Sequence, residues 1–259
     1  MINALIGDIG NTITKICLIE IRNLRIKKII YFNSNNISSK NFLKKNLKKI
    51  LKKTPINRIA LFSSVVPSYQ LILEKFLKKN YKIELKEIKE KAINKIVKIN
   101  IKNKNQVGSD RIANAAGVYK KYKANCIVLD FGTATTFDVV TRKGIYNGGI
   151  IAPGLNLSIK TLSSSADQIP IFSIKKQKKV IGKNTVEALR SGFYWGYSGL
   201  INNIILKIEN ETKKKYKIIF TGGYADLFKA SIIRPFKIDK NITIKGIIEI
   251  FKRNKKYLN

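Results

Sequence analysis

Two glycine-containing turns, each with one aspartate, are the segments of this chain best suited to hold a polyphosphate. The run Asp130-Phe131-Gly132-Thr133-Ala134-Thr135-Thr136 follows an apolar stretch, and Asp8-Ile9-Gly10-Asn11-Thr12 follows another near the N-terminus. In such a turn glycine lets the backbone approach a ligand closely, while hydroxyls and amide N–H groups face an anion. Two ordinary β-turns would explain either segment alone, but the pair favours a duplicated fold that binds a polyphosphate between its halves.

A third aspartate, Asp110, stands at the predicted start of a helix and is followed by Arg111. The helix dipole stabilises a carboxylate at this position as the anion. Such a carboxylate could accept a proton from a substrate hydroxyl, which is the general-base role in phosphoryl transfer. The planar guanidinium of Arg111 suits a carboxylate or a phosphate. A helix cap with a surface salt bridge explains the same two residues equally well.

Other nucleotide-binding patterns are weaker or absent. Lys15 adds a cation after the first turn, although a surface lysine on a strand is the simpler reading in a lysine-rich chain. The segment Thr221-Gly222-Gly223-Tyr224-Ala225 could admit a flat adenine ring, or it could be a plain strand-to-helix turn. Neither the P-loop pattern nor the dinucleotide-binding glycine pattern occurs in the chain.

The composition narrows the chemistry further. The chain has 259 residues and no histidine, which excludes a Ser-His-Asp triad, a histidine base and the usual zinc sites. Cys17 and Cys126 lie in apolar strand patterns, which is typical of buried thiols in a reducing cytoplasm. We expect no membrane span and no export signal, because no apolar run reaches about 18 residues and Asp8 interrupts the N-terminal one. Catalysis must come from carboxylates, hydroxyls, backbone groups and bound ions.

The chain is strongly basic. Lys and Arg number 51 against 16 Asp and Glu, which gives a formal charge of +35 and raises nucleic acid or an anionic membrane as a partner. However, the excess is lysine spread along the chain together with abundant Ile and Asn, the residues of A/T-rich codons. We therefore attribute the charge to compositional drift and expect no specific nucleic-acid partner and no membrane partner.

The predicted elements repeat. Residues 3–31 read as three consecutive strands, and residues 126–151 read as three strands in the same order. Helices and strands alternate after each set, which predicts an α/β fold. We place a domain boundary near residues 118–124, giving domains 1–120 and 121–259. A long helix from Gly182 to about Thr212 and a last helix near 242–252 complete the pattern.

Taken together, these motifs resemble type III pantothenate kinase, a family of the acetate/sugar kinase–heat-shock protein–actin superfamily. The resemblance covers nearly the whole chain and rests on five motifs in family order. They are Asp8-Ile9-Gly10-Asn11-Thr12 with Lys15, Gly108-Ser109-Asp110-Arg111, Asp130 to Thr136, Gly148-Gly149-Ile150-Ile151-Ala152-Pro153-Gly154, and Gly182-Lys183-Asn184-Thr185 with Gly192.

The resemblance implies two tandem ribonuclease-H-like (actin-like ATPase) domains, with mixed sheets flanked by helices, that phosphorylate pantothenate from ATP. It implies Asp110 as the proton acceptor, and Gly108, Ser109, Asp110, Arg111 and Thr185 as pantothenate contacts. It implies Asp130 as the ligand of a monovalent cation, K⁺ or NH₄⁺, with Mg²⁺ accompanying ATP, in a cytoplasmic homodimer. The implied ATP contacts are Asp8, Ile9, Gly10, Asn11, Thr12, Ile13, Thr14, Lys15 and Thr133.

The chain departs from the family pattern just before Gly108. A tyrosine that contacts pantothenate in the family is Ile101 here, and the proline of an Asn-Pro pair is Lys104. This departure leaves open a kinase of another small hydroxyl substrate, and the formal charge of +35 leaves open a non-catalytic regulatory or DNA-associated relative. Asp110-dependent turnover with pantothenate would separate the kinase from both.

Overall fold

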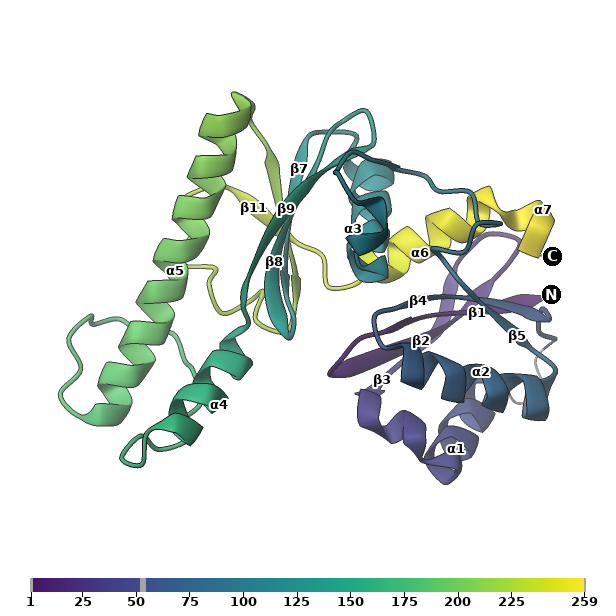
Figure 1. Ribbon diagram of the computed structural model, residues 1–259, viewed down its shortest axis with the longest axis horizontal. Coiled ribbons are helices and arrows are strands. Elements are labelled where there is room, and N and C mark those ends of the chain that lie inside the picture. Colours follow the sequence, from purple (N-terminus) through teal and green to yellow (C-terminus); the bar gives the residue numbers. More distant parts are fainter. Residues whose placement is uncertain (1, 52–54, 259) are drawn as a thin grey trace. The chain divides into compact units, whose positions relative to one another are not determined.

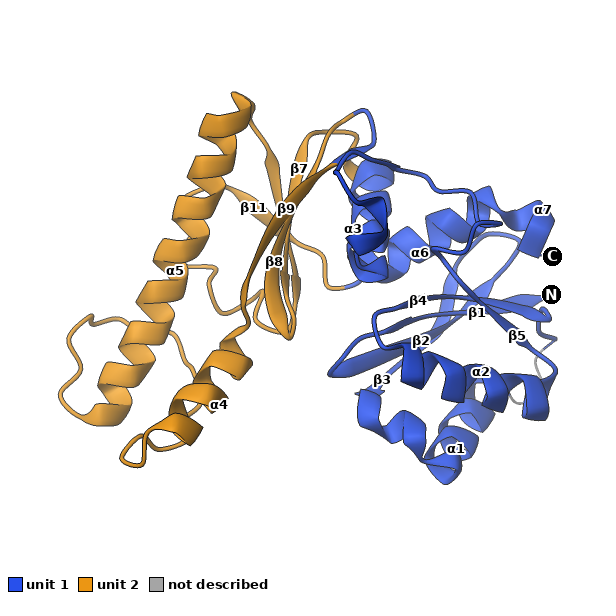
Figure 2. Cartoon of the chain, viewed as in Figure 1, with its two compact units in different colours: residues 1–121, 143–146, 241–259 blue, residues 122–142, 147–240 orange. Residues whose placement is uncertain are grey.

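The computed structural model describes residues 2–51 and 55–258, which form two compact units (Figure 2). Unit 1 comprises residues 1–121, 143–146 and 241–259, and unit 2 comprises residues 122–142 and 147–240. Each unit contains a mixed sheet flanked by helices, as the resemblance implied. The division into domains 1–120 and 121–259 stays a prediction, because two later segments of the chain belong with unit 1.

The sheet of unit 1 has five strands in the order β3-β2-β1-β4-β5. The first three strands form the predicted antiparallel meander, and β4 and β5 add to β1 in parallel. Aspartate Asp8 therefore lies at the carboxyl end of a strand with a neighbour on each side. The strands are β1 (Asn3–Ile9), β2 (Ile13–Glu20), β3 (Ile26–Asn33), β4 (Ile59–Ser64) and β5 (Glu84–Glu87).

Helices cover both faces of this sheet (Figure 1). One core cluster combines side chains of α1 and α2 with Leu5, Ile16 and Phe62 of the strands. On the other side α6 packs against β1 and β4. The helices of unit 1 are α1 (Lys40–Leu51), α2 (Pro67–Tyr81), α3 (Ser109–Tyr122), α6 (Ile242–Arg253) and the short α7 (Lys255–Leu258), with 3₁₀ turns at Ser34–Ser38 and Lys104–Gln106.

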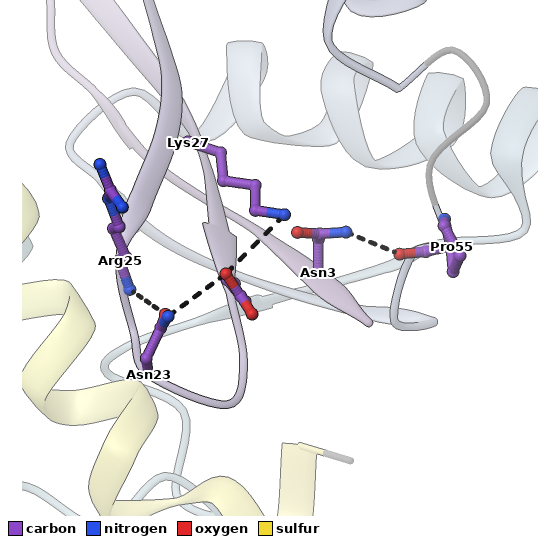
Figure 3. A network of polar contacts seen from close by, with 6 residues as sticks. Asn3, Asn23, Arg25, Lys27 and Pro55 are labelled. Atoms are coloured by element: carbon purple, nitrogen blue, oxygen red, sulfur yellow. Dashed lines mark hydrogen bonds and ion pairs between the residues drawn. The ribbon is translucent and has the colours of Figure 1, made fainter. Parts of the chain in front are cut away.

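A small polar network closes the turn between β2 and β3 (Figure 3). Asn23 Nδ2 donates to the buried Glu20 Oε2 at 3.3 Å, and Lys27 Nζ lies 3.8 Å from the same oxygen. The backbone N–H of Arg25 donates to Asn23 Oδ1 at 2.9 Å. A buried carboxylate needs such partners, so the network holds the end of the strand that carries Lys15.

Helices α3 and α6 cross at very close range through two glycines. A Cβ built on Gly246 of α6 would lie 1.8 Å from the Ala113 carbonyl oxygen of α3. A Cβ on Gly117 of α3 would lie 2.5 Å from the Ile242 oxygen of α6. Only glycine permits this approach, and through it the C-terminal helix supports the helix that begins at Ser109 and Asp110.

Unit 2 repeats the strand order of unit 1. Its strands run β9-β8-β7-β10-β11, with β7 and β8 antiparallel and β10 and β11 parallel to β7. The short β6 (Lys98–Ile99) pairs with Ile145 and Tyr146 at the start of β9. The elements are β7 (Cys126–Phe131), β8 (Ala134–Val140), β9 (Ile145–Pro153), α4 (Leu155–Ser165), α5 (Thr185–Thr212), β10 (Lys217–Gly222) and β11 (Phe236–Ile238).

Candidate active site

The first aspartate turn joins β1 to β2. Asp8 is buried and faces Lys15 across the antiparallel pair, so both side chains lie on the same face of the sheet. Gly10 N–H donates to the Ile13 carbonyl at 3.2 Å, and a Cβ on Gly10 would lie 2.9 Å from that oxygen. Asn11 and Thr12 are exposed, so the tip of the turn is accessible to a ligand while Asp8 and Lys15 flank it.

A serine that the sequence analysis did not single out supports this turn. Ser34 Oγ donates to the Gly10 carbonyl at 2.6 Å, and its backbone N–H donates to the Thr12 carbonyl at 2.9 Å. Thr14 Oγ1 lies 2.8 Å from Ser34 Oγ, and both residues are fully buried. Of the predicted ATP contacts, Thr14 therefore directs its hydroxyl into the protein, and Ile9 directs its side chain into the core.

Asp110 is held beside the same edge of the sheet by the first turn of α3. Ser109 Oγ donates to the Ser64 carbonyl at 3.0 Å, and Ser64 pairs with Ile9 in the parallel β1–β4 register. The Arg111 N–H donates to Asp110 Oδ1 at 2.8 Å. This geometry gathers the Asp8–Lys15 turn and the Gly108–Arg111 segment, predicted as separate parts of one site, at the carboxyl ends of β1 and β4.

Arg111 is oriented by an aromatic ring. Its guanidinium carbon lies 5.8 Å from the centroid of Tyr146, which is fully buried at the start of β9. A cation above an aromatic face is attracted by the ring's quadrupole. Tyr146 was not singled out in the sequence, where it reads as one more apolar strand position. The ring therefore favours one orientation of the Arg111 guanidinium.

Glu87, at the end of β5, is a second acid close to this segment. Burial raises the pKa of its carboxyl above the ordinary value of 4.5, although hydrogen bonding to Ser109 and to the Lys89 N–H lowers that pKa in part. The Lys89 N–H donates to Glu87 Oε2 at 2.6 Å. The folded protein therefore binds a proton at Glu87 more tightly than the unfolded chain does.

This difference predicts a pH-dependent effect of Glu87→Gln. With a folded pKa above the unfolded one, the contribution of Glu87 to stability is complete below about pH 4.5. It is lost as the pH rises through the folded pKa. Glutamine does not titrate, so Glu87→Gln should gain stability over the parent between pH 4 and pH 8, by about 1.4 kcal/mol per unit of pKa elevation. Urea unfolding at pH 4 and at pH 8 measures the free energy of unfolding of the variant and of the parent. If the variant differs from the parent by the same amount at both pH values, the prediction is wrong.

The second aspartate turn lies in unit 2 between β7 and β8. Asp130 pairs with Thr136 across the antiparallel ladder and with Thr221 of the parallel strand β10. Gly222 has a φ of +86° and lies against the Asp130 carboxylate, because a Cβ there would lie 2.7 Å from Asp130 Oδ1. Only glycine fits at this position. A Cβ on Gly154 would lie 2.0 Å from the Thr133 carbonyl oxygen and 2.9 Å from that of Gly132.

This turn contains the kinds of oxygen that could bind a hard monovalent cation. Carboxylate and carbonyl oxygens are the ligands that such ions prefer, and Asp130 and the Gly132–Thr133 backbone supply both kinds. Within residues 2–51 and 55–258, acidic and cysteine side chains nowhere gather in threes as a divalent-metal site would need. The Thr133 side chain is exposed at the tip of the turn.

The two units also share a hydroxyl residue beside the aspartate of each turn, Asp8 in unit 1 and Asp130 in unit 2. Ser63 of β4 pairs with Asp8, and Thr221 of β10 pairs with Asp130, in both cases on the neighbouring parallel strand. Both residues are almost fully buried, and among the residues that the structure describes neither hydroxyl has a hydrogen-bond partner. Side chains opposite one another in a parallel ladder lie on the same face, so each aspartate has a hydroxyl neighbour that the sequence did not reveal.

Thr185 begins α5, the long helix of unit 2. Asn184 Oδ1 accepts the Glu187 N–H at 2.9 Å, and Glu187 Oε2 accepts the Lys183 N–H at 2.8 Å, a reciprocal cap of the helix start. Gly182 precedes this cap, where a Cβ would lie 2.3 Å from the Ala188 nitrogen. Thr185 lines an apolar cavity of about 520 Å³ with Leu189, Gly192, Phe193, Gly196 and neighbouring residues of α4 and α5.

The cysteines take no part in this chemistry. Burial raises the pKa of both the Cys17 and the Cys126 thiol to about 12, so neither is a nucleophile near neutral pH. Both thiols are free and buried, as predicted. In the described ranges of the chain, no helix has the length and apolar character to span a membrane.

Comparison with known proteins agrees with the motifs. A family model described as type III pantothenate kinase matches residues 4–207. A type III pantothenate kinase of Pelagibacter ubique (strain HTCC1062) is 49% identical over 244 residues, which cover 94% of this chain and 96% of that protein.

Solved structures agree at the level of the fold. A Campylobacter jejuni structure, provisionally described as a Baf family transcriptional activator, has a TM-score of 0.62 and 21% identity, covering 97% of this chain and 99% of that one. A Sinorhizobium meliloti structure, provisionally described as a 2-dehydro-3-deoxygalactonokinase, has a TM-score of 0.60 and 7% identity, covering 96% of both chains. At these identities the likeness concerns architecture alone, and that architecture is the actin-like one with two mixed sheets.

Proposed function

Because the chain belongs to the type III pantothenate kinase family, we propose that it transfers the γ-phosphoryl group of ATP to the primary hydroxyl of pantothenate. The product is 4′-phosphopantothenate, and the reaction is the first step of coenzyme A synthesis. The observation that carries the proposal is the position of Asp110, at the start of α3 and beside the Asp8–Lys15 turn. A proton acceptor and a phosphate-binding turn at the same strand ends are what phosphoryl transfer to an alcohol requires.

In this mechanism the Asp110 carboxylate accepts the proton of the pantothenate hydroxyl as its oxygen attacks the γ-phosphorus. A bond forms between that oxygen and the γ-phosphorus, the bond from the γ-phosphorus to the β–γ bridging oxygen breaks, and ADP leaves. Lys15 and the amide groups from Ile9 to Thr14 stabilise the charge that develops on the phosphate oxygens. Gly108 to Arg111 and Thr185 bind pantothenate, with Arg111 as the partner for its carboxylate.

We assign two ions to the reaction. Mg²⁺ enters with ATP, and a monovalent cation, K⁺ or NH₄⁺, binds at Asp130 with the carbonyl oxygens of the same turn. When bound, the cation neutralises part of the charge of the crowded phosphates. Support comes from the carboxylate of Asp130 and the carbonyl groups of Gly132 and Thr133, which are oxygen ligands within one turn.

The assignment predicts potassium-dependent turnover. Purified protein with Mg-ATP should release ADP only when pantothenate is added, and replacing K⁺ with Na⁺ should lower kcat by about tenfold or more. Asp130→Asn should remove the difference between the two salts. A coupled ADP assay measures the rates. Equal rates in both salts would contradict the cation site, and absence of pantothenate-dependent release in either would contradict the substrate.

Turnover with another small alcohol instead of pantothenate would favour a relative with changed specificity, for which Ile101 is the sequence feature in support.

We further propose a cytoplasmic homodimer, without specific nucleic-acid or membrane partners. Support comes from α5, where no atom of the described residues lies within 4 Å of a Cβ built on Gly192 or Gly196. Small residues on an open apolar helix face allow a second helix to approach closely. Sedimentation velocity on the preparation used for the ADP assay tests the dimer.

A further inference from the structure

Lys89, just after β5, is bonded to the loop that leads into the Gly108–Arg111 segment. Its ammonium group donates to the Asn105 carbonyl at 2.9 Å and to the Val107 carbonyl at 3.0 Å. We propose that Lys89 is a positioning residue for pantothenate phosphorylation: it fixes the loop 103–107 and thereby the placement of Gly108 and Asp110. The proposal rests on the function assigned above and names a further residue that this function needs.

The loop has little to hold it in place on its own. Residues 102–106 are all exposed, and Val107 is the first buried position before Gly108. Its one turn of 3₁₀ helix, Lys104–Gln106, is closed by the Gln106 N–H to Asn103 bond at 3.2 Å and the Val107 N–H to Lys104 bond at 3.4 Å. Such a short turn leaves carbonyl groups without partners inside the helix. The ammonium group of Lys89 bonds two carbonyls of this region at once.

Lys89 is itself anchored to the sheet of unit 1. Its backbone N–H donates to Glu87 Oε2 at 2.6 Å, and the Glu87 N–H donates to Glu90 Oε1 at 2.8 Å. Glu87 pairs with Phe62 in the parallel β4–β5 ladder. The lysine backbone is therefore fixed by a short turn that follows the edge strand β5, and only its side chain spans the distance to the loop.

Two side chains, Lys89 and Ser109, thus anchor the segment on either side of Gly108. On the N-terminal side, Lys89 bonds to the carbonyls of Asn105 and Val107. On the C-terminal side, Ser109 Oγ bonds to the Ser64 carbonyl. Both anchors belong to the β4–β5 edge, which sets Asp110 relative to the β1 turn. Loss of the Lys89 contact should misplace Gly108 to Arg111 without disturbing the Asp8–Lys15 turn.

The expected kinetic signature is specific to the alcohol substrate. Small misplacements of groups that orient a substrate lower rates by as much as about 100-fold. Lys89→Met should therefore lower kcat/KM for pantothenate by about 10- to 100-fold, while the KM for ATP changes by less than about threefold. Lys89→Arg, which can also donate to both carbonyls, should restore most of kcat/KM. Lys91→Met is the matched control, because it removes an equal charge from an exposed position of the same turn.

Amide hydrogen exchange gives a second readout that does not depend on turnover. In Lys89→Met the amides of residues 104–110 should exchange about tenfold or more faster than in the parent, and those of 9–15 should not change. Unchanged exchange in 104–110 would overturn the proposal whatever the enzyme's substrate proves to be. Equal losses of kcat/KM in Lys89→Met and Lys91→Met would overturn it as well, since general charge would then be the cause. Failure of the parent to use pantothenate, with faster exchange in Lys89→Met, would reject the substrate and keep the positioning role.

Discussion

Replacing Asp110 with asparagine is expected to lower kcat for pantothenate phosphorylation by about 10³-fold or more, with the fold preserved. General-base catalysis contributes about 10²- to 10⁴-fold, and an amide cannot accept the proton. Asparagine has the same shape, and its oxygen can still accept the Arg111 N–H that Asp110 Oδ1 now accepts. A coupled ADP assay at saturating ATP and pantothenate measures the loss.

The control for this experiment is Asp167→Asn, at an exposed aspartate outside the site, which should leave kcat within about twofold. Circular dichroism and thermal unfolding of both variants check the fold. Turnover of Asp110→Asn near the parent rate would remove Asp110 from the proton-transfer role. A variant that does not fold would also count against the assignment, because it would make Asp110 a structural cap of α3.

Gly246→Ala is expected to cause the largest loss of stability, about 3 kcal/mol or more in the free energy of unfolding. Its Cβ would lie 1.8 Å from the Ala113 carbonyl oxygen and 3.0 Å from the Gly117 nitrogen, both backbone atoms of α3 that no side-chain rotation can move away. Overpacking a well-packed contact costs about 1–3 kcal/mol, occasionally more, and here two helices must separate. Urea unfolding followed by tryptophan fluorescence and circular dichroism measures the difference.

Gly223→Ala, just after β10, provides the comparison. No atom of the described residues lies within 4 Å of a Cβ at Gly223, so the added methyl group has no backbone to displace. The stability of this variant should stay within about 1 kcal/mol of the parent. If both variants lose stability equally, the close crossing of α3 and α6 is not the cause.

The sequence predicted the parts of the site that reside in a local pattern. A strand, an aspartate, a glycine and hydroxyl residues in succession predicted both turns, and the structure places Asp8 and Asp130 at equivalent strand ends. The repeated meander predicted the duplicated sheets for the same reason, since alternation of apolar residues is local. The three-residue strand β11 was missed. The apolar residues of the run 96–101 predict a strand over that whole run, but only Lys98–Ile99 form one, β6. Strands as short as β6 and β11 form because a neighbouring strand is there to pair with them, and their own residues carry little strand signal.

The supporting residues could not be predicted, because their partners are distant in the chain. Ser34 reaches back to Gly10, Tyr146 lies under Arg111, and Lys89 bonds to Asn105 and Val107. None of these types is unusual where it stands, and one lysine among so many carries no local signal. Only the fold, which brings the ends of β3, β5 and β9 to their partners, makes these residues distinctive.

The close crossing of α3 and α6 also has a consequence for how the chain is made. A ribosome releases residues 1–121 first, yet the helix that packs on β1, β4 and α3 comes from residues 242–253, after all of unit 2. The first sheet therefore emerges with one face uncovered, and the apolar residues of that face stay exposed until residues 242–253 have been made. Unit 2, which is continuous apart from residues 143–146 at the turn into β9, can close its core earlier. In the cell, unit 1, which carries Asp110, can thus be completed only after unit 2, and it is the unit that depends more on protection from aggregation during translation.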